Sequence, residues 1–164
     1  MTDVEIIKGY VPGSIGRVTQ LHGTYYHRHW NFSLFFEARV ATELAEFLGR
    51  YDQHRDGFWI AMQGGRIEGS IAIDGLNAED TGVHLRWFIM SEALRGKCIG
   101  RQLIDTAIGF CHGTGYKRVY LCTFEGLNAA RHLYEKAGFR LVEQQKGSQW
   151  GTEVNEQRFE LQLG

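Results

Sequence analysis

The sequence is poor in several features that mark special classes of protein. It has one proline, Pro12, and only three cysteines, Cys98, Cys111 and Cys122, whose spacing matches neither a disulfide framework nor a pair of metal-binding knuckles. We therefore predict no metal site and a reducing, cytoplasmic location. The formal net charge is -1, with 18 basic and 19 acidic residues, which argues against an extended nucleic-acid-binding face. No apolar run approaches transmembrane length, and the first residues lack the basic and apolar regions of a signal peptide, so no membrane partner is expected.

The length and composition are those of an ordinary globular chain. With 164 residues and a hydrophobic fraction of 43%, the chain is long enough to bury a core without staples, and we predict one domain over residues 1–164. A first strand is predicted over residues 4–10, followed by a helix capped by Ser14. A second helix is predicted after Asn31 or Ser33, with its apolar face formed by Phe35, Ala38, Ala41, Leu44 and Leu48.

The middle of the chain alternates like a set of strands. Residues 58–62 and 67–74 flank a glycine pair that favours a tight hairpin turn, and a further strand is expected over residues 84–90. After this strand the pattern changes to helix 100–112, strand 118–123 and helix 127–137, and strands 139–143 and 154–163 close the chain. A strand, a helix and a strand in this order imply a parallel pair joined by a right-handed crossover. The predicted fold class is therefore α+β, built on one mixed sheet.

The junction between strand 84–90 and helix 100–112 suits an anion. The turn contains Gly96 and Gly100, and the helix that follows contributes unpaired N–H groups and the positive end of its dipole. Such a junction fits a pyrophosphate, although a glycine-containing loop is often only a helix entry. No Gly-Lys-Ser/Thr follows, and the glycine spacing differs from that of the dinucleotide fingerprint, so both of those nucleotide sites are excluded.

A second group of residues starts the helix at 127–137. Asn128 lies where a strand leads into the helix, and Tyr134 follows less than two turns later on nearly the same face. Taken alone, Asn128 is a helix cap and Tyr134 a core aromatic residue. The two groups together, in this order, favour a shared role.

In combination these motifs resemble the GCN5-related N-acetyltransferase (GNAT) superfamily. The turn Arg95-Gly96-Lys97-Cys98-Ile99-Gly100 is similar to the family's cofactor motif, Arg/Gln-x-x-Gly-x-Gly/Ala, and residues 128–139 are similar to its second motif. The stretch Gly13-Ser14-Ile15-Gly16 is similar to acetyltransferase domains fused to winged-helix regulators of the MarR type. The resemblance implies a mixed sheet flanked by helices on both faces, with a splay between its two parallel central strands.

The resemblance also implies a cofactor, acetyl-CoA, and the residues that hold it. The pantetheine arm would pair with the backbone near Phe88, Ile89 and Met90, and Asn128 and Tyr134 would lie beside it. Cys98 stands where the family usually has glycine, and it would be strained if the position requires a positive φ. The pyrophosphate would be bound at Arg95, Gly96, Lys97, Cys98, Ile99, Gly100 and Arg101.

The implied activity is transfer of an acetyl group to a primary amine by direct attack in a ternary complex. Tyr134 would act as general acid towards the departing thiolate. The general base is left open between Glu125, the better placed candidate, Glu37 and water, and residues 25–30 are expected to line the acceptor pocket. The acceptor is a small-molecule amine or a protein amine, and a homodimer follows from family habit. The alternative is a catalytically weak acyl-CoA-binding sensor or interaction module.

Overall fold

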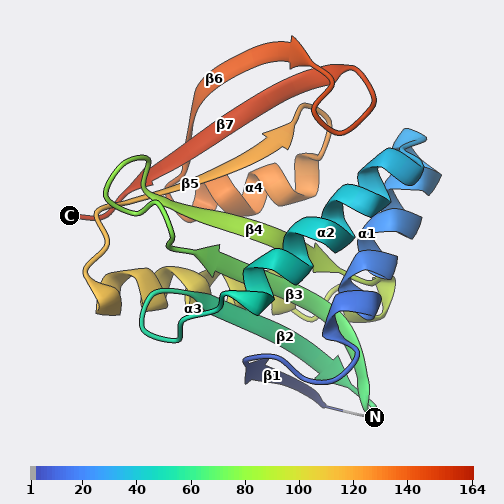
Figure 1. The fold of residues 1–164 in the computed structure, drawn as a ribbon, viewed down its shortest axis with the longest axis horizontal. Coiled ribbons are helices and arrows are strands. Elements are labelled where there is room, and N and C mark those ends of the chain that lie inside the picture. Colours follow the sequence, from blue (N-terminus) through green and yellow to red (C-terminus); the bar gives the residue numbers. More distant parts are fainter. Residues whose placement is uncertain (1–2) are drawn as a thin grey trace.

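The fold is a seven-stranded mixed sheet with helices on both faces (Figure 1). The computed structural model describes residues 3–164, and the strand order is β1-β2-β3-β4-β5-β7-β6. Only β4 and β5 run parallel among the pairs of neighbouring strands described, which confirms the predicted α+β fold class. The strands are β1 Val4–Lys8, β2 Gly57–Gln63, β3 Arg66–Asp74, β4 Val83–Met90, β5 Arg118–Phe124, β6 Arg140–Gly147 and β7 Val154–Gln162.

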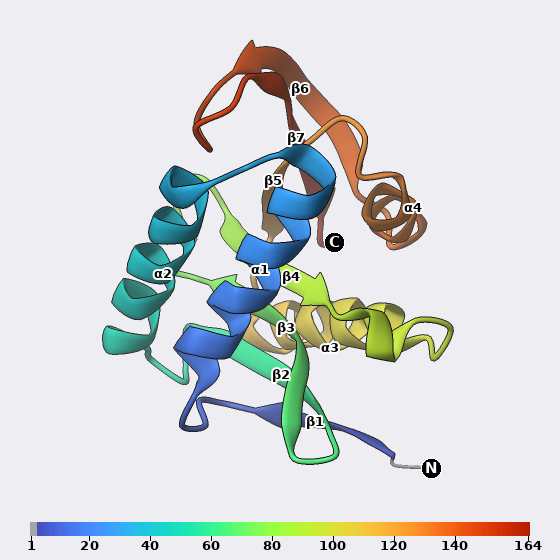
Figure 2. The same ribbon diagram turned by 90° about the vertical axis from the view of Figure 1, so that its right-hand side faces the viewer.

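The helices form two outer layers. Helices α1 (Ser14–Trp30) and α2 (Leu34–Gly49) cover one face of the sheet, and α3 (Ile99–Thr114) and α4 (Asn128–Lys136) cover the other (Figure 2). A short 3-10 helix, η1 (Glu92–Leu94), leads from β4 towards α3. Among the helices of residues 3–164, none is both long enough and apolar enough to span a bilayer.

Strand β2 shows how the sheet separates two cores. Phe58 and Ile60 are buried against α1 and α2, whereas Trp59 and Ala61 are buried in the cluster that contains the apolar face of α3. Successive side chains of a strand point to opposite faces, so a strand with both faces covered is apolar throughout.

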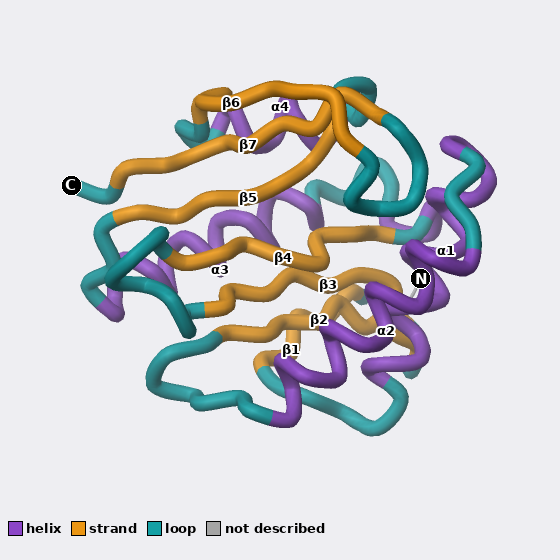
Figure 3. The backbone as a smooth tube through the Cα atoms, turned by 45° about the horizontal axis from the view of Figure 1, so that its top comes forward, coloured by secondary structure: helices purple, strands orange, loops and turns teal. Residues whose placement is uncertain are grey.

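Strands β4 and β5 separate after a short stretch of pairing. Their register pairs only Val83 with Val119 and His84 with Tyr120 within the described chain, and beyond these residues the strands diverge (Figure 3). The resemblance predicted this splay, and the structure confirms it. The separation leaves one edge of β4 without a neighbouring strand. It also leaves a gap in the sheet that connects its two faces.

A β-bulge in β4 lies beside the opening. The register of β3 and β4 shifts between Ser70 and Ala72, and Trp87 on β4 has a positive φ of 48°. The Ser70 hydroxyl donates to the Trp87 carbonyl oxygen at 2.7 Å, which holds the distorted segment. Bulges bend the strand that carries them and re-aim its side chains, so the distortion directs the following residues of β4.

The beginning of the chain differs from the predictions in two details. Strand β1 ends at Lys8 rather than at residue 10 because Gly9 takes a positive φ of 105°. Ser14 does not cap α1: Gly13 is the capping residue, and the Ser14 hydroxyl instead exchanges hydrogen bonds with the Val11 backbone.

The prediction of the apolar face of α2 was wrong, because the buried face is rotated by part of a turn from the predicted one. Phe35 was assigned to it but is 59% exposed, and among the predicted positions Leu44 is fully buried. A spacing of three residues repeated several times drifts around a helix that has 3.6 residues per turn. The face that packs on the sheet is Phe36, Val40, Leu44 and Phe47.

Two later boundaries also differ. Helix α3 continues through Gly113 to Thr114, because Gly115, with a φ of 85°, forms the left-handed cap. Strand β6 extends to Gly147, so the loop between β6 and β7 begins later than residue 146.

The prediction that Asn128 caps a helix is wrong. Asn128 is the first residue of α4, and its side chain makes no cap hydrogen bond.

Candidate active site

A cavity of about 180 Å³ occupies the opening between β4 and β5. Helices on both faces of the sheet contribute to its wall, α1 and α2 from one side and α4 from the other, so the cavity passes through the sheet. Its lining residues are His22, Tyr26, Phe36, Arg39, Val40, Glu43, His84, Leu85, Arg86, Trp87, Phe88, Leu121, Cys122, Thr123, Phe124, Leu127, Ala130, Tyr134, Gln149 and Trp150.

Tyr134 is the buried hydroxyl on the α4 side of the cavity. Its ring packs between Phe88 of β4, with 5.9 Å between ring centroids, and Phe139 and Phe159. Burial raises the pKa of the Tyr134 hydroxyl, and the nearby Tyr26 adds to this. Within residues 3–164 the hydroxyl has no hydrogen-bond partner, and the residue keeps 7% of its surface exposed at the cavity. It is therefore protonated at neutral pH and free to donate into the cavity.

The turn before α3 presents a group of free backbone donors. The N–H groups of Arg95 and Lys97 are used, by the carbonyls of Glu92 and Leu94, and the first helical bond runs from Gln102 to Cys98. Adjacent unpaired N–H groups at a helix N-terminus form an anion-binding cradle. Within the described chain, the N–H groups without a hydrogen-bonded acceptor are those of Gly96, Cys98, Ile99, Gly100 and Arg101.

Two residues of this cradle have special backbone requirements. Cys98 has a φ of 59° and a ψ of 20°, the left-handed conformation that disfavours side chains, and it is exposed. Gly100 is buried, and a Cβ there would lie 2.7 Å from Met90 Cε and 3.1 Å from Leu133 Cδ1. The absent side chain of Gly100 thus lets α3 approach both β4 and α4.

Several predicted site residues lie outside the cavity wall, including Ile89, Met90 and the whole turn 95–101. Glu125 is exposed on the turn between β5 and α4, and its carboxylate accepts from Asn155 Nδ2 at 2.9 Å. Asn128 is exposed at the start of α4. Glu37 is exposed on α2, with its carboxylate close to Gly23 of α1. The structure thus brings together Tyr134 and the β4 backbone but leaves these polar groups at the surface.

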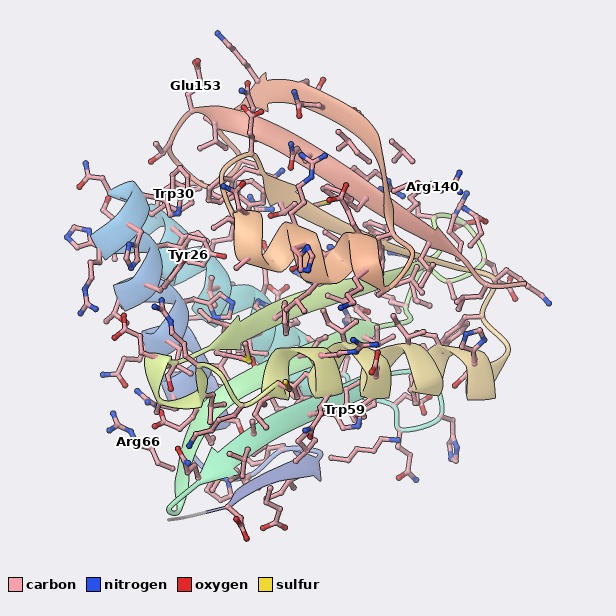
Figure 4. All side chains as sticks on the ribbon, turned by 180° about the vertical axis from the view of Figure 1, so that it is seen from behind. Tyr26, Trp30, Trp59, Arg66, Arg140 and Glu153 are labelled. Atoms are coloured by element: carbon pink, nitrogen blue, oxygen red, sulfur yellow. The ribbon has the colours of Figure 1, made fainter. Side chains whose placement is uncertain are left out.

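The predicted acceptor segment, residues 25–30, contributes one cavity residue, Tyr26. Its ring lies among Phe32, Phe36 and Phe124, and burial raises the pKa of its hydroxyl. Trp30 lies beside the turn into α4, where a Cβ on Gly126 would meet its ring (Figure 4). Among the residues that the structure describes, no group of three or more His, Cys, Asp or Glu side chains is arranged to hold a metal ion.

The sequence reasoning missed the charged wall of the cavity. Arg39 and Glu43 on α2 lie one turn apart, and Arg39 Nε donates to Glu43 Oε2 at 2.7 Å. Arg86 of β4 donates to the other oxygen of Glu43. The available signals were an Arg and a Glu four residues apart on a predicted helix, and charged or polar residues at alternate positions of an otherwise apolar strand.

Two histidines line the cavity in neutral form. Burial lowers the pKa of His22 to about 4, against the opposing effect of its hydrogen bond to the Val18 carbonyl. Burial also lowers the pKa of His84 to about 3, and His84 stacks on Tyr120 with 4.3 Å between ring centroids.

Comparison with known proteins agrees with this geometry. The sequence matches the acetyltransferase (GNAT) family over residues 17–139, which contain the splay, the N–H cradle and Tyr134. The chain belongs to the GNAT family. N-acetyltransferase 8 of Rattus norvegicus is 30% identical over 103 residues, which are 60% of this chain and 46% of that protein. The uncharacterised Escherichia coli K12 N-acetyltransferase YjgM is 29% identical over 101 residues, 61% of this chain and 60% of that protein.

Solved structures show that this GNAT chain shares its whole fold with other members. A GNAT acetyltransferase from Staphylococcus aureus Mu50 superposes with a TM-score of 0.78 at 19% identity, covering 99% of this chain and 100% of that one. A Salmonella typhimurium protein, described with its cofactor acetyl-CoA, gives a TM-score of 0.70 at 16% identity and covers 98% and 95% of the two chains. The chain spans about half the length of the relatives matched by sequence.

The residues present fit acetyl-CoA. A pyrophosphate needs several converging donors, and the unpaired N–H groups between Gly96 and Arg101 provide them. An extended amide-containing arm needs a free strand edge, and β4 beyond His84 provides one. Both elements lie at the same end of β4, joined only by η1 and a short turn.

Proposed function

We propose that this chain transfers the acetyl group of acetyl-CoA to a primary amine by direct attack in a ternary complex. The observation that carries the proposal is the joint arrangement of three features: a splayed β4 edge, an N–H cradle between β4 and α3, and an unpartnered Tyr134 hydroxyl that lines the opening beside Phe88. Each of these features occurs in proteins of other function, whereas their combination supports acyl transfer from a pyrophosphate-containing thioester.

The backbone of β4 and the following turn would hold the cofactor. Phe88, Ile89 and Met90 offer backbone groups to the pantetheine arm, and the cradle from Gly96 to Arg101 offers N–H groups to the pyrophosphate. Arg95, Lys97 and Arg101 are exposed around the cradle and add positive charge. Acetyl-CoA supplies an activated acyl group when it is bound.

Tyr134 is proposed as the general acid. Its raised pKa keeps the hydroxyl protonated, so the proton is present when negative charge develops on the leaving sulfur. The same apolar surroundings make a thiolate more basic, as burial does to the Cys111 thiol, whose pKa it raises to about 12. Proton transfer from tyrosine to sulfur is therefore less unfavourable in this cavity than ordinary pKa values imply.

For the base, we propose Glu125 acting through solvent. Glu125 directly follows Phe124, which lines the cavity, but its exposed carboxylate is held by Asn155 and does not line the cavity itself. Water at the cavity mouth would carry the amine proton to this carboxylate or to bulk solvent.

The alternative function is an acyl-CoA-binding sensor, and the observation that favours it is the left-handed conformation of Cys98 at the cradle. The test measures thiol release from acetyl-CoA across a panel of primary amines, together with calorimetric binding of CoA. Amine-dependent thiol release supports the enzyme. CoA binding without turnover on any amine supports the sensor and overturns our proposal.

Several finer predictions accompany the proposal. A cytoplasmic location, a homodimer, and a choice between small-molecule and protein amines remain predictions. The same holds for the single-domain boundaries 1–164, for the role of Asn128 beside the cofactor, and for the similarity to domains fused to winged-helix regulators.

A further inference from the structure

The wall of the cavity on the α2 side is a network of charged side chains. Glu43 accepts from Arg39 Nε at 2.7 Å and from Arg86, and Arg86 Nη1 also donates to Asp74 Oδ2 at 3.2 Å. Arg50 donates to both oxygens of Asp74, at 3.1 and 2.7 Å. Helix α2 lies on the opposite face of the sheet from α4, which carries Tyr134 (Figure 2). The network therefore forms the far wall of the cavity from the proposed general acid.

The local field in this part of the cavity is positive. Among residues 3–164, the charged side chains that line the cavity are Arg39, Arg86 and Glu43, two cations and one anion. Burial is the main cause of the lowered pKa of His84; in addition, Arg86, Arg158 and Arg39 lower this pKa and Asp74 raises it, which agrees with a positive wall. A positive field favours an anionic group and disfavours a further cation.

Both arginines keep donors for a ligand. A guanidinium has five N–H donors. Within the described chain, the hydrogen bonds of Arg86 to Asp74 and Glu43 use only its two terminal nitrogens and leave Nε without an acceptor. Arg39 Nη2 has only a long contact of 3.5 Å to Gln149 Oε1, and the Arg39 side chain is 34% exposed. A carboxylate oxygen can replace this weak contact with a charge-assisted hydrogen bond.

The size of the cavity limits the acceptor. Its volume of about 180 Å³ is below the ~300–1,000 Å³ of pockets that enclose drug-sized ligands. The aromatic side chains of Tyr26, Trp87 and Trp150 line the same cavity as the charged wall. A small, compact acceptor fits this enclosure.

We propose that the acceptor is a small amine that carries a carboxylate, and that Arg39 and Arg86 bind this carboxylate while the amine points towards the opening between β4 and β5. This inference rests on the proposed acetyl transfer and names its substrate class. The positive wall also favours the neutral form of the amine, which is the nucleophilic form. Glu43 limits the net charge of this wall and competes with the ligand carboxylate for the two guanidiniums.

The test compares acceptors that differ only in the carboxylate. A panel of L-amino acids is assayed at one pH against the corresponding L-amino acid carboxamides and against amines that lack both groups. We expect kcat/KM to be at least ten-fold higher for the carboxylates, roughly the effect of one charge-assisted hydrogen bond. The amine of a carboxamide is less basic than that of the amino acid, so at one pH more of it is in the neutral, nucleophilic form. This difference favours the carboxamides, so it cannot produce the expected preference for carboxylates.

Variants then locate the recognition. Arg39→Gln is expected to raise KM for the carboxylates ten-fold or more without changing KM for the carboxamides, and Arg39→Lys is expected to restore part of the loss. Glu43→Gln is expected to lower KM for the carboxylates because it removes the competing anion. Arg66→Gln is the matched control, since Arg66 is exposed at the start of β3, far from the cavity wall (Figure 4). Melting temperatures identify any variant that has lost its fold.

The outcomes separate this inference from the proposed function. Equal or better turnover of carboxamides or simple amines overturns the carboxylate inference and leaves acetyl transfer standing. A loss in Arg39→Gln that is the same for carboxylates and carboxamides also overturns it. No turnover of any amine, with CoA still bound, overturns both.

Discussion

The ring of Tyr134 on α4 lies 5.9 Å from the ring of Phe88 on β4, at the edge of the opening in the sheet. This contact joins the helix that carries the proposed acid to the strand whose backbone is proposed to hold the cofactor. Together with the contacts to Phe139 and Phe159, it holds the Tyr134 ring in place, because the hydroxyl makes no hydrogen bond within residues 3–164.

Replacing Tyr134 with phenylalanine is therefore expected to affect chemistry and not stability. The rings still pack, so the free energy of unfolding should change by less than about 1 kcal/mol. The loss of the acid should lower kcat by about 10²–10⁴-fold, with little effect on CoA affinity. Steady-state thiol release and calorimetry check both parts, and turnover equal to that of the parent chain would remove Tyr134 from the mechanism.

The left-handed conformation of Cys98 predicts that glycine is the better residue there. Cys98→Gly removes a conformational cost of about 1–2 kcal/mol from the folded chain. It also stabilises the unfolded chain by about 0.5–1 kcal/mol, because glycine has more conformational freedom there. We expect a gain in unfolding free energy of up to about 1 kcal/mol and equal or tighter CoA binding. Cys98→Val, with a β-branched side chain, should lower both. Denaturant unfolding measures the stability of the two variants, and calorimetry measures their CoA affinity. A Cys98→Val chain that is more stable than the Cys98→Gly chain would show that the turn does not need a left-handed residue.

Two glycines of α3 are expected to respond differently to alanine. Gly109 has open space where a Cβ would be, so Gly109→Ala should gain about 0.5–1 kcal/mol of stability from helix propensity. Gly100→Ala inserts a Cβ 2.7 Å from Met90 Cε, so the Met90 side chain must shift. We expect Gly100→Ala to be about 1–2 kcal/mol less stable than Gly109→Ala in urea unfolding. Equal stabilities would indicate that α3 is not in close contact with β4 at Gly100.

The buried His22 predicts a loss of stability in acid. Its pKa is lowered to about 4 in the folded chain from 6.5, so below pH 6.5 the unfolded chain binds a proton that the folded chain excludes. The free energy of unfolding should thus fall as the pH drops from 6.5 to about 4, by roughly 1.4 kcal/mol per pH unit from this residue.

The measurement is the pH dependence of urea unfolding in two variants. His22→Gln should have a shallower slope between pH 6.5 and 4 than the parent chain, although it loses some stability at every pH. His54→Gln, at an exposed histidine, should keep the parent slope. Identical slopes in all three chains would contradict the buried neutral form of His22.

The sequence predicted the elements better than their faces. Strands and helices are visible as changes of apolar period, and their order implied the parallel β4–β5 pair. Helix α2 shows the limit, because Phe35 and Phe36 are equally apolar neighbours and only packing against the sheet decides that Phe36 is buried. Gly113 and Gly115 pose the same problem at the end of α3, where both are glycines and only Gly115 forms the cap.

The site divides in the same way. The cradle from Gly96 to Arg101 is local, so its glycines and the following helix were recognisable in sequence. The charged wall joins Glu43 to Arg86, which lie 43 positions apart in the chain, and this pairing depends on how α2 packs on the sheet. The bulge at Trp87 depends on the register of β3 and β4, which residue types alone do not specify.

Hydrogen–deuterium exchange with and without CoA shows which backbone N–H groups receive the cofactor. We expect CoA-dependent protection in peptides that cover residues 85–90 and 96–101, with no change in the β6–β7 hairpin. Protection confined to other segments, in a chain that binds CoA by calorimetry, would contradict the proposed cofactor site.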